Sequence, residues 1–185
     1  MSHTLSKTEY TLPLYVECTL KANKGDTTLL VTTDALNTYA DGNWRAAANS
    51  VNSILWGTFY DSEYVASNRV TTYYAWGVSG VSNGRVDRDW TAYSMTKFSM
   101  FIDETKVIMY QEEGWEKYRF DRLNYPSFWD SVDANDGKVR VGTWNFERGQ
   151  GQFTDLKVGS YNPWADPSVP SWGTQPFEKT DSTVL

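Results

Sequence analysis

The strongest structural signal in this chain is an alternation of apolar and polar residues that recurs along most of its length. Its clearest instance places Leu12, Leu14, Val16, Cys18 and Leu20 at every second position. A period of two puts successive side chains on opposite faces of an extended strand, so one face of this strand is expected to be buried. No segment is convincingly helical over ten residues. Many short strands separated by turn residues predict an all-β fold, an antiparallel β-sandwich or jelly roll.

The clearest expected topology is a β-meander over residues 93–120. Its strands are expected at Tyr93–Ile102, Val107–Gln111 and Lys117–Phe120, with a tight turn at 103–106. Other strands are expected at 27–33, 53–60, 68–78 and 153–158, with helical turns around 46–48 and 127–132. The run Asn-Lys-Gly-Asp at 23–26 predicts a turn that leads into residues 27–33, which would pair back on the first strand.

A length of 185 residues suits one domain that buries its own core. We expect a flexible N-terminus at residues 1–9, the sandwich at 10–161, and a C-terminal strap or linker at 162–185, which contains prolines and tryptophans. The first residues lack the apolar core of a signal peptide. We therefore expect a module from a longer extracellular or surface-exposed protein, in preference to a chain that stays where it is made.

The few histidines and cysteines exclude several kinds of chemistry. His3 is the only histidine and lies in an N-terminus that is expected to be frayed, which argues against Ser-His-Asp and Cys-His catalysis. Cys18 is the only cysteine, so no intrachain disulfide can form. Cys18 is interpreted as a small core residue. The net charge is −6, with 17 Lys and Arg scattered among 23 acids, and this pattern argues against a nucleic-acid partner. No apolar run approaches the ~20 residues of a membrane span, which argues against membrane insertion.

Two segments in the second half of the chain carry a more specific pattern. The first is the strand Trp90–Asp103 with its return at Val107–Tyr110, and the second is the closing run Val139–Val158, which ends in Phe-Thr-Asp-Leu-Lys-Val. Together they resemble the concanavalin A-like (laminin-G-like) jelly-roll superfamily. The resemblance covers about residues 90–160 and implies a jelly roll. It specifies a fold better than a function, because lectins, carbohydrate-binding modules, glycoside hydrolases, polysaccharide lyases and adhesion modules share it.

Aromatic side chains supply the functional hypothesis. They make up 16% of the chain, with nine Trp and twelve Tyr, and each offers a flat apolar face with a polar edge. Together with the resemblance, they predict a lectin-like, carbohydrate-binding module that stacks on an oligosaccharide or polysaccharide and hydrogen-bonds its hydroxyls. The candidate contacts are Trp56, Arg69, Tyr74, Trp76, Trp144 and Arg148. For each tryptophan, a place in the core is the alternative.

Two other functions stay open at this point. The first is a glycan-cleaving enzyme of the same fold, a glycoside hydrolase or a polysaccharide lyase. The hydrolases that the resemblance suggests carry Glu-x-Asp-x-x-Glu on one strand, and this motif is absent here. Glu112–Glu116 is the nearest run but is expected at a solvated turn, and Glu147 is a weak candidate for a catalytic acid. The second is a structural or adhesion domain of a surface or phage protein.

No cofactor is required by the sequence, but a structural Ca²⁺ is conceivable at two places. The resemblance implies a calcium at Asp155, in the Phe-x-Asp pattern, with backbone carbonyls from the turn at Gly25 and Asp26. The alternative is that Asp155 pairs with a neighbouring cation. The acidic residues between Asp130 and Asp136 do not have the spacing of an EF-hand loop and are interpreted as a capped turn.

Overall fold

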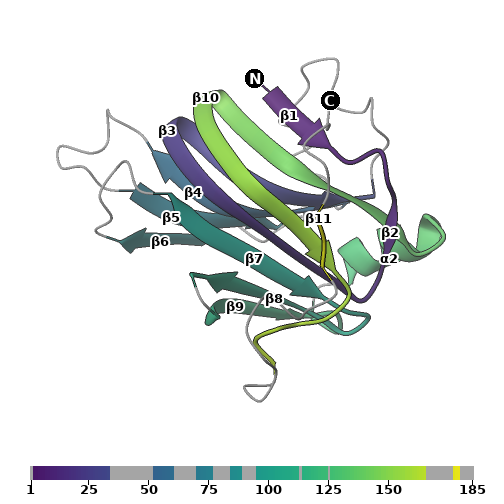
Figure 1. Cartoon of the computed structure of the whole chain (residues 1–185). Coiled ribbons are helices and arrows are strands. Elements are labelled where there is room, and N and C mark those ends of the chain that lie inside the picture. The colour runs from purple at the N-terminus through teal and green to yellow at the C-terminus, as the bar shows by residue number, and fades with distance from the viewer. Residues whose placement is uncertain are drawn as a thin grey trace.

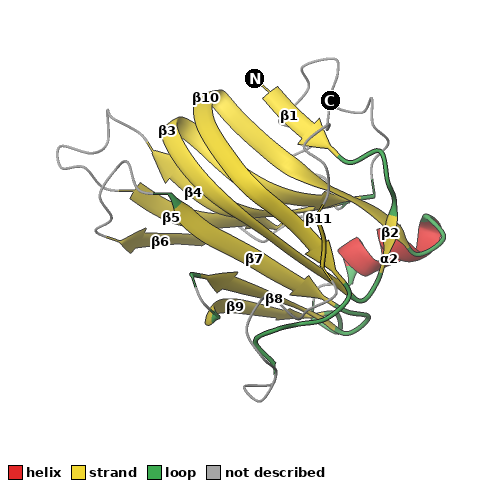
Figure 2. Cartoon of the chain, in the orientation of Figure 1, coloured by secondary structure: helices red, strands yellow, loops and turns green. Residues whose placement is uncertain are grey.

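The computed structural model of the chain describes residues 2–33, 52–60, 70–76, 84–88, 95–112, 114–124, 126–165 and 177–179. These residues form strands that pair antiparallel and one helix, as Figures 1 and 2 show, so the predicted all-β antiparallel class is confirmed. The elements are β1 (Ser2–Leu5), β2 (Tyr10–Thr11), β3 (Leu14–Thr32), β4 (Ser53–Tyr60), β5 (Val70–Trp76), β6 (Gly84–Arg88), β7 (Thr96–Ile102), β8 (Lys106–Gln111), β9 (Trp115–Asp121), α2 (Ser127–Ala134), β10 (Lys138–Gly159) and β11 (Phe177–Lys179).

Two long strands, β3 and β10, run side by side through the whole sandwich (Figure 1). Their pairing extends from Arg140 opposite Thr32 to Gly159 opposite Tyr15. Each half of β3 has a different partner on its other edge. The half at 25–32 pairs with β4, and the half at 14–20 pairs with β7. The first layer of the sandwich is therefore β6-β5-β4-β3 and the second is β3-β7-β8-β9, joined through the long strands.

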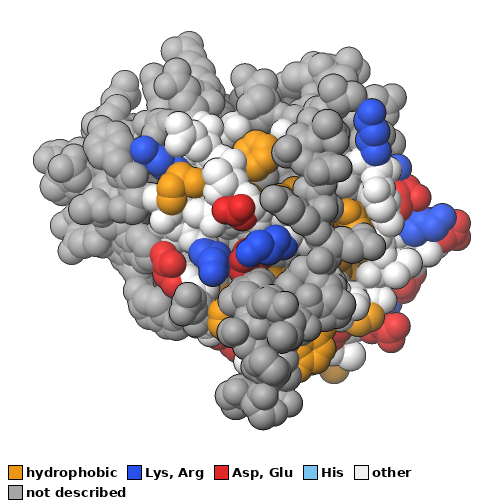
Figure 3. Space-filling view, in the orientation of Figure 1, with side chains coloured by type: hydrophobic (Ala, Val, Ile, Leu, Met, Phe, Trp, Pro, Cys, Tyr) orange, Lys and Arg blue, Asp and Glu red, His pale blue; other side chains and the backbone are white. Residues whose placement is uncertain are grey.

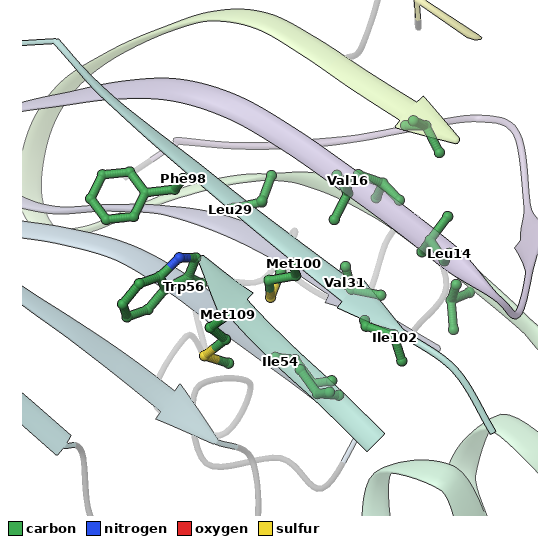
Figure 4. Packing of buried hydrophobic residues seen from close by; sticks show 14 of the residues in the cluster. Leu14, Val16, Leu29, Val31, Ile54, Trp56, Phe98, Met100, Ile102 and Met109 are labelled. Atoms are coloured by element: carbon green, nitrogen blue, oxygen red, sulfur yellow. The ribbon is translucent and has the colours of Figure 1, made fainter. Parts of the chain in front are cut away.

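The core lies between these two layers (Figure 4). Leu29, Val31, Ile54 and Trp56 come from the first layer, and the second contributes alternate residues of β3, β7 and β8. Those alternate residues are Leu14, Val16, Cys18, Leu20, Phe98, Met100, Ile102, Val107 and Met109. The predicted alternation at the start of β3 is thus confirmed, including the core position of Cys18. Burial raises the pKa of the Cys18 thiol to about 12, so this cysteine is inert at neutral pH.

The long strands bend where they pass from one layer to the other. The register between them shifts on both sides of Gln150, which marks irregular pairing at this point. Gly151 lies directly against Thr27 and Asn145, whose side chains are hydrogen-bonded at 2.8 Å. A Cβ on Gly151 would overlap both of those side chains, so the bend requires a residue that has no side chain.

The turn and helix predictions of the second half are confirmed. Asp103 closes the β7–β8 turn, since its Oδ1 accepts hydrogen bonds from the backbone N–H groups of Thr105 and Lys106 at 2.7 and 2.9 Å. The helix α2 buries three apolar side chains, and Trp129 Nε1 donates to the carbonyl of Asp103 at 2.7 Å. Within the described ranges, no helix has both the length and the apolar character needed to cross a membrane.

Two sequence-based predictions about the N-terminal half are wrong. Residues 2–5 are not a flexible end, because they form β1, which pairs with β10, and Leu5 is buried. Four residues are too few for an alternation to be recognised. The expected turn at 23–26 is also absent, because β3 runs through these residues without interruption.

The acidic residues between Asp130 and Asp136 do form a capped turn at the end of α2, in which Gly137 N donates to Val132 O at 2.9 Å.

Gln111 provides a test of the core. Its side chain is fully buried, and neither atom of its amide has a hydrogen-bond partner in the described part of the chain. Since an unsatisfied buried polar group costs about 1–3 kcal/mol, Gln111→Met should stabilise the protein by an amount of that order. Thermal and urea unfolding would measure it. Gln152→Met, at an exposed position, is the matched control and should change stability little. A destabilised Gln111→Met variant would contradict the prediction.

Candidate functional site

The described residues enclose a groove of about 480 Å³ on the outer face of the second layer. One wall is the outer face of β7, β8 and β9, and the other is the segment Ser160–Ala165, which we call the strap. The strap follows directly from the end of β10. The residues that line the groove are Phe101, Lys106, Ile108, Tyr110, Gly114, Glu116, Arg119, Ser160, Tyr161, Asn162, Trp164 and Ala165.

Hydrogen bonds fix the strap against the sheet. Asn162 is 4% exposed, and its Nδ2 donates to the Tyr110 hydroxyl at 2.8 Å. Its Oδ1 accepts from the backbone N–H of Trp164 at 3.1 Å. The indole Nε1 of Trp164 donates to the Tyr15 hydroxyl at 3.0 Å. The strap is therefore anchored to β3 and β8, and its aromatic side chains have defined positions.

The turn between β8 and β9 fits closely under Trp164. Gly114 has a φ of 76°, which favours glycine, and a Cβ at this position would lie 2.5 Å from Cε3 of the Trp164 ring. Glycine is thus required both by the backbone and by the approach of the ring. The Trp164 and Tyr110 ring centroids are 6.4 Å apart with an interplanar angle of 51°.

A bidentate ion pair stands at the rim of the groove. Arg119 Nε and Nη2 lie 3.0 and 2.8 Å from the two carboxylate oxygens of Glu116. These hydrogen bonds lower the pKa of the Glu116 carboxyl, so it is ionised at neutral pH. Both side chains are more than 40% exposed, so the pair adds little stability but presents a fixed polar surface.

A β-bulge puts these two residues on the same face. In an unbroken strand, residues 116 and 119 would point to opposite sides. Met109 on β8 lies opposite Tyr118 on β9, but the next residue, Tyr110, lies opposite Glu116. The strand β9 therefore has one residue more than β8 at this point, which is a β-bulge. Glu116 consequently shares the outer face with Tyr110, as Arg119 does with Ile108.

Beside the strap lies a buried carboxylate, Glu17, which is 1% exposed on the outer face of β3. Its Oε2 accepts a hydrogen bond from the Tyr15 hydroxyl at 3.2 Å, and its Oε1 lies 3.3 Å from Lys157 Nζ. Burial raises the pKa of Glu17, and the charges of Lys97 and Lys157 oppose that shift. Figure 3 shows acidic and basic side chains gathered near the middle of one face of the molecule.

The buried carboxyl of Glu17 should make the free energy of unfolding depend on pH. A carboxyl whose pKa is raised by folding contributes most to stability at acid pH and loses that contribution as the pH rises through its folded pKa. Glu17→Gln removes the ionisable group, so it should raise Tm at pH 7.5, with the difference disappearing near pH 4. A gain on the order of 1 kcal/mol would correspond to about 2–4 °C in a chain of this size.

The control for this series is Glu9→Gln. Glu9 is an exposed partner of Arg140 at 2.9 Å, and its replacement should change Tm little at either pH. If Glu17→Gln were less stable than the natural chain at pH 7.5, the ion pair with Lys157 would outweigh the cost of burial, contrary to this prediction.

Of the predicted sugar contacts, Trp56 and Trp144 have side chains that the structure describes, and neither of them lines the groove. Trp56 is 1% exposed in the core, and its Nε1 donates to the Tyr110 carbonyl at 2.7 Å across the two layers, so it offers no surface for a sugar. Its core alternative is therefore the one that the structure supports. Trp144 on β10 lies opposite Thr28 on β3, and its side chain is 4% exposed.

The other predicted contacts are placed only by their backbone or not at all. In β5, Tyr74 pairs with Trp56 and Trp76 pairs with Ile54. Glu147 and Arg148 lie in the irregular part of β10 between Phe146 and Gln150. Arg69 and the short helix expected at 46–48 lie outside the described residues. A sugar contact at these residues therefore remains a prediction.

The two residues of the predicted calcium site lie in different parts of the strand pair. Asp26 pairs with Phe146 beside the bend, whereas Asp155 occupies the register shift between Thr154 and Lys157 and has a φ of 57°. The turn that was to supply carbonyls at Gly25 and Asp26 is strand. Among the described residues, no three His, Cys, Asp or Glu side chains are grouped as metal ligands would be. A structural calcium stays a prediction.

Sequence reasoning missed the residues that do form the groove. Tyr161 was assigned to the end of the sandwich. Asn162 and Trp164 begin the segment 162–185, whose prolines and tryptophans indicate a strap but not the surface that it covers. Glu116 was read as a solvated turn acid. Only the bulge, which sequence periodicity does not reveal, brings it beside Arg119.

Fold and groove together define an antiparallel β-sandwich with an aromatic groove and a fixed ion pair on one outer face. No model of a known protein family matches the sequence, and no curated protein matches it either. The chain is similar to an endo-β-1,3-glucanase from Pyrococcus furiosus, with 14% identity and a TM-score of 0.45, over 89% of this chain and 58% of that one.

Two further solved structures are similar to the same extent. The mixed-linkage-glucan GH16 protein of Bacteroides ovatus is 12% identical, with a TM-score of 0.46, over 75% of this chain and 56% of that one. A congerin II double mutant is 10% identical, with a TM-score of 0.47, over 85% of this chain and 98% of that one. At these identities and TM-scores, the similarities say nothing about the activity of this chain.

Proposed function

We propose that this protein is a carbohydrate-binding domain and that the groove between the outer sheet and the strap holds the glycan. The observation that carries the proposal is the combination of aromatic side chains on both walls with a fixed Glu116–Arg119 pair at the rim. Phe101 stands on the sheet side, and Tyr161 and Trp164 on the strap, and all three are partly exposed. Aromatic faces suit the apolar faces of sugar rings, and a few placed polar groups supply orientation.

The proposed mechanism is binding without covalent chemistry. Hydrolysis by the usual route needs two carboxyl groups on either side of the scissile bond. Among the described residues that line the groove, Glu116 is the only carboxylate, and Arg119 holds it ionised. An ionised carboxylate engaged on both oxygens is unsuited to donating a proton, whereas it accepts hydrogen bonds from hydroxyl groups well.

Binding should weaken when either the aromatic or the polar contact is removed. A glycan-array screen of the purified protein, with and without Ca²⁺, would select ligands for titration calorimetry. Arg119→Ala and Trp164→Ala should each weaken binding by about tenfold or more, which corresponds to about 1.4 kcal/mol. Trp164→Phe keeps a ring but loses the bond to Tyr15, and it should fall between the natural chain and Trp164→Ala.

Arg122→Ala is the matched control. Arg122 also forms a surface ion pair, with Asp133 at 2.6 Å, but it does not line the groove, so its loss should leave affinity unchanged. Normal binding by both Arg119→Ala and Trp164→Ala would place the site elsewhere. If no glycan on the array binds the protein, the proposal is overturned. Release of reducing sugar or of unsaturated product from a bound glycan would favour the enzyme instead.

A further inference from the structure

Each charged side chain that the structure describes in the lining of the groove has a partner of opposite charge. Lys106 Nζ lies 3.0 Å from Asp103 Oδ2, and Arg119 is engaged by both oxygens of Glu116. Burial raises the pKa of Asp103, but hydrogen bonds from Thr105 and Lys106 outweigh it and hold this pKa below its usual value. Both acids are therefore ionised at neutral pH, and each of these two cations already has a counter-charge.

This pairing works against an anionic ligand. A uronate or sulfate group that binds Arg119 must either displace Glu116 or use the N–H groups that Glu116 leaves open, because Glu116 already engages Nε and Nη2. In both cases the ionised Glu116 stays beside the ligand, and like charges placed together weaken binding. An anion that approaches Lys106 would likewise lie beside the ionised carboxylate of Asp103.

The same pairing suits neutral hydroxyl groups. A guanidinium has five N–H donors, so Arg119 retains N–H groups beyond the two that face Glu116, and each carboxylate oxygen retains a lone pair. The rim therefore offers a donor next to an acceptor. A pair of neighbouring sugar hydroxyls, one accepting and one donating, matches this arrangement without disturbing the ion pair.

The floor of the groove adds to this preference. Ile108 and Tyr110 are each 4% exposed, and Tyr110 already accepts its hydrogen bond from Asn162. A floor of this kind is apolar or already hydrogen-bonded, so it gives no additional positive charge to an anion. We infer that, if the groove binds glycans as proposed above, it selects neutral oligosaccharides and discriminates against those that carry uronate or sulfate groups.

The test compares ligands of equal length by calorimetry. The neutral probes are cellohexaose, laminarihexaose and maltohexaose, and the acidic probes are hexagalacturonate and a sulfated heparin hexasaccharide, each at low and moderate salt. We expect measurable binding of at least one neutral probe, little affected by salt, and affinity for the acidic probes lower by about tenfold or more.

Glu116→Gln separates charge pairing from shape. This variant leaves Arg119 without a counter-charge, so the ratio of acidic to neutral affinity should rise by about tenfold. Glu116 is exposed, so the fold is expected to persist, and circular dichroism would verify that. Asp133→Asn is the matched control, because it unpairs Arg122 away from the groove and should leave the ratio unchanged.

The outcomes separate the two proposals. Tighter binding of an acidic probe by the natural chain would overturn the selectivity while leaving carbohydrate binding in place. An unchanged ratio in Glu116→Gln would overturn the role of the pair. Failure of every probe and of the wider array would overturn the proposed function, and the inference with it.

Discussion

The structure depends on the pairing of β3 with β10. These two strands, whose pairing is interrupted by register shifts, connect both layers, since one half of β3 pairs with β4 and the other half pairs with β7. A ladder that serves two layers has to bend, and the bend is possible because Gly151 lets the strands close over Thr27 and Asn145. The register of this pair therefore decides which side chains enter the core, because a slip of one residue would turn every side chain to the opposite face.

The groove follows from the same alternation. Leu14 and Val16 enter the core, so Tyr15 and Glu17 must lie on the outer face, where they meet the strap and Lys157. On β8, Tyr110 links three parts of the molecule. Its carbonyl accepts from Trp56 in the core, and its hydroxyl accepts from Asn162 in the strap. The wall of the groove is thus rigidly connected to the packing between the layers.

Periodicity predicted the parts of the fold that local pattern determines, namely the first half of β3 and the β7–β8–β9 meander, and the helical turn expected around 127–132 lies within α2. It failed where the backbone departs from the regular strand. Residues 23–26 have the composition of a turn but continue β3 through the bend, and the bulge in β9 reverses the face that counting assigns to Glu116. The candidate site was missed for a second reason. A strap is positioned by long-range hydrogen bonds such as that from Trp164 to Tyr15, and these leave no local signature.

Two carboxylates on this outer face have pKa values shifted in opposite directions, a pattern that often identifies an acid and a base in catalysis. Their surroundings argue for a different role here. Glu17, whose pKa is raised, is buried, and both of its oxygens are engaged, by Tyr15 and by Lys157. Glu116 is exposed, yet Arg119 keeps it ionised. Glu17 is enclosed by its partners and does not line the groove, and Glu116 is held on both oxygens by Arg119. The opposite pKa shifts are thus explained by burial in one case and by an ion pair in the other.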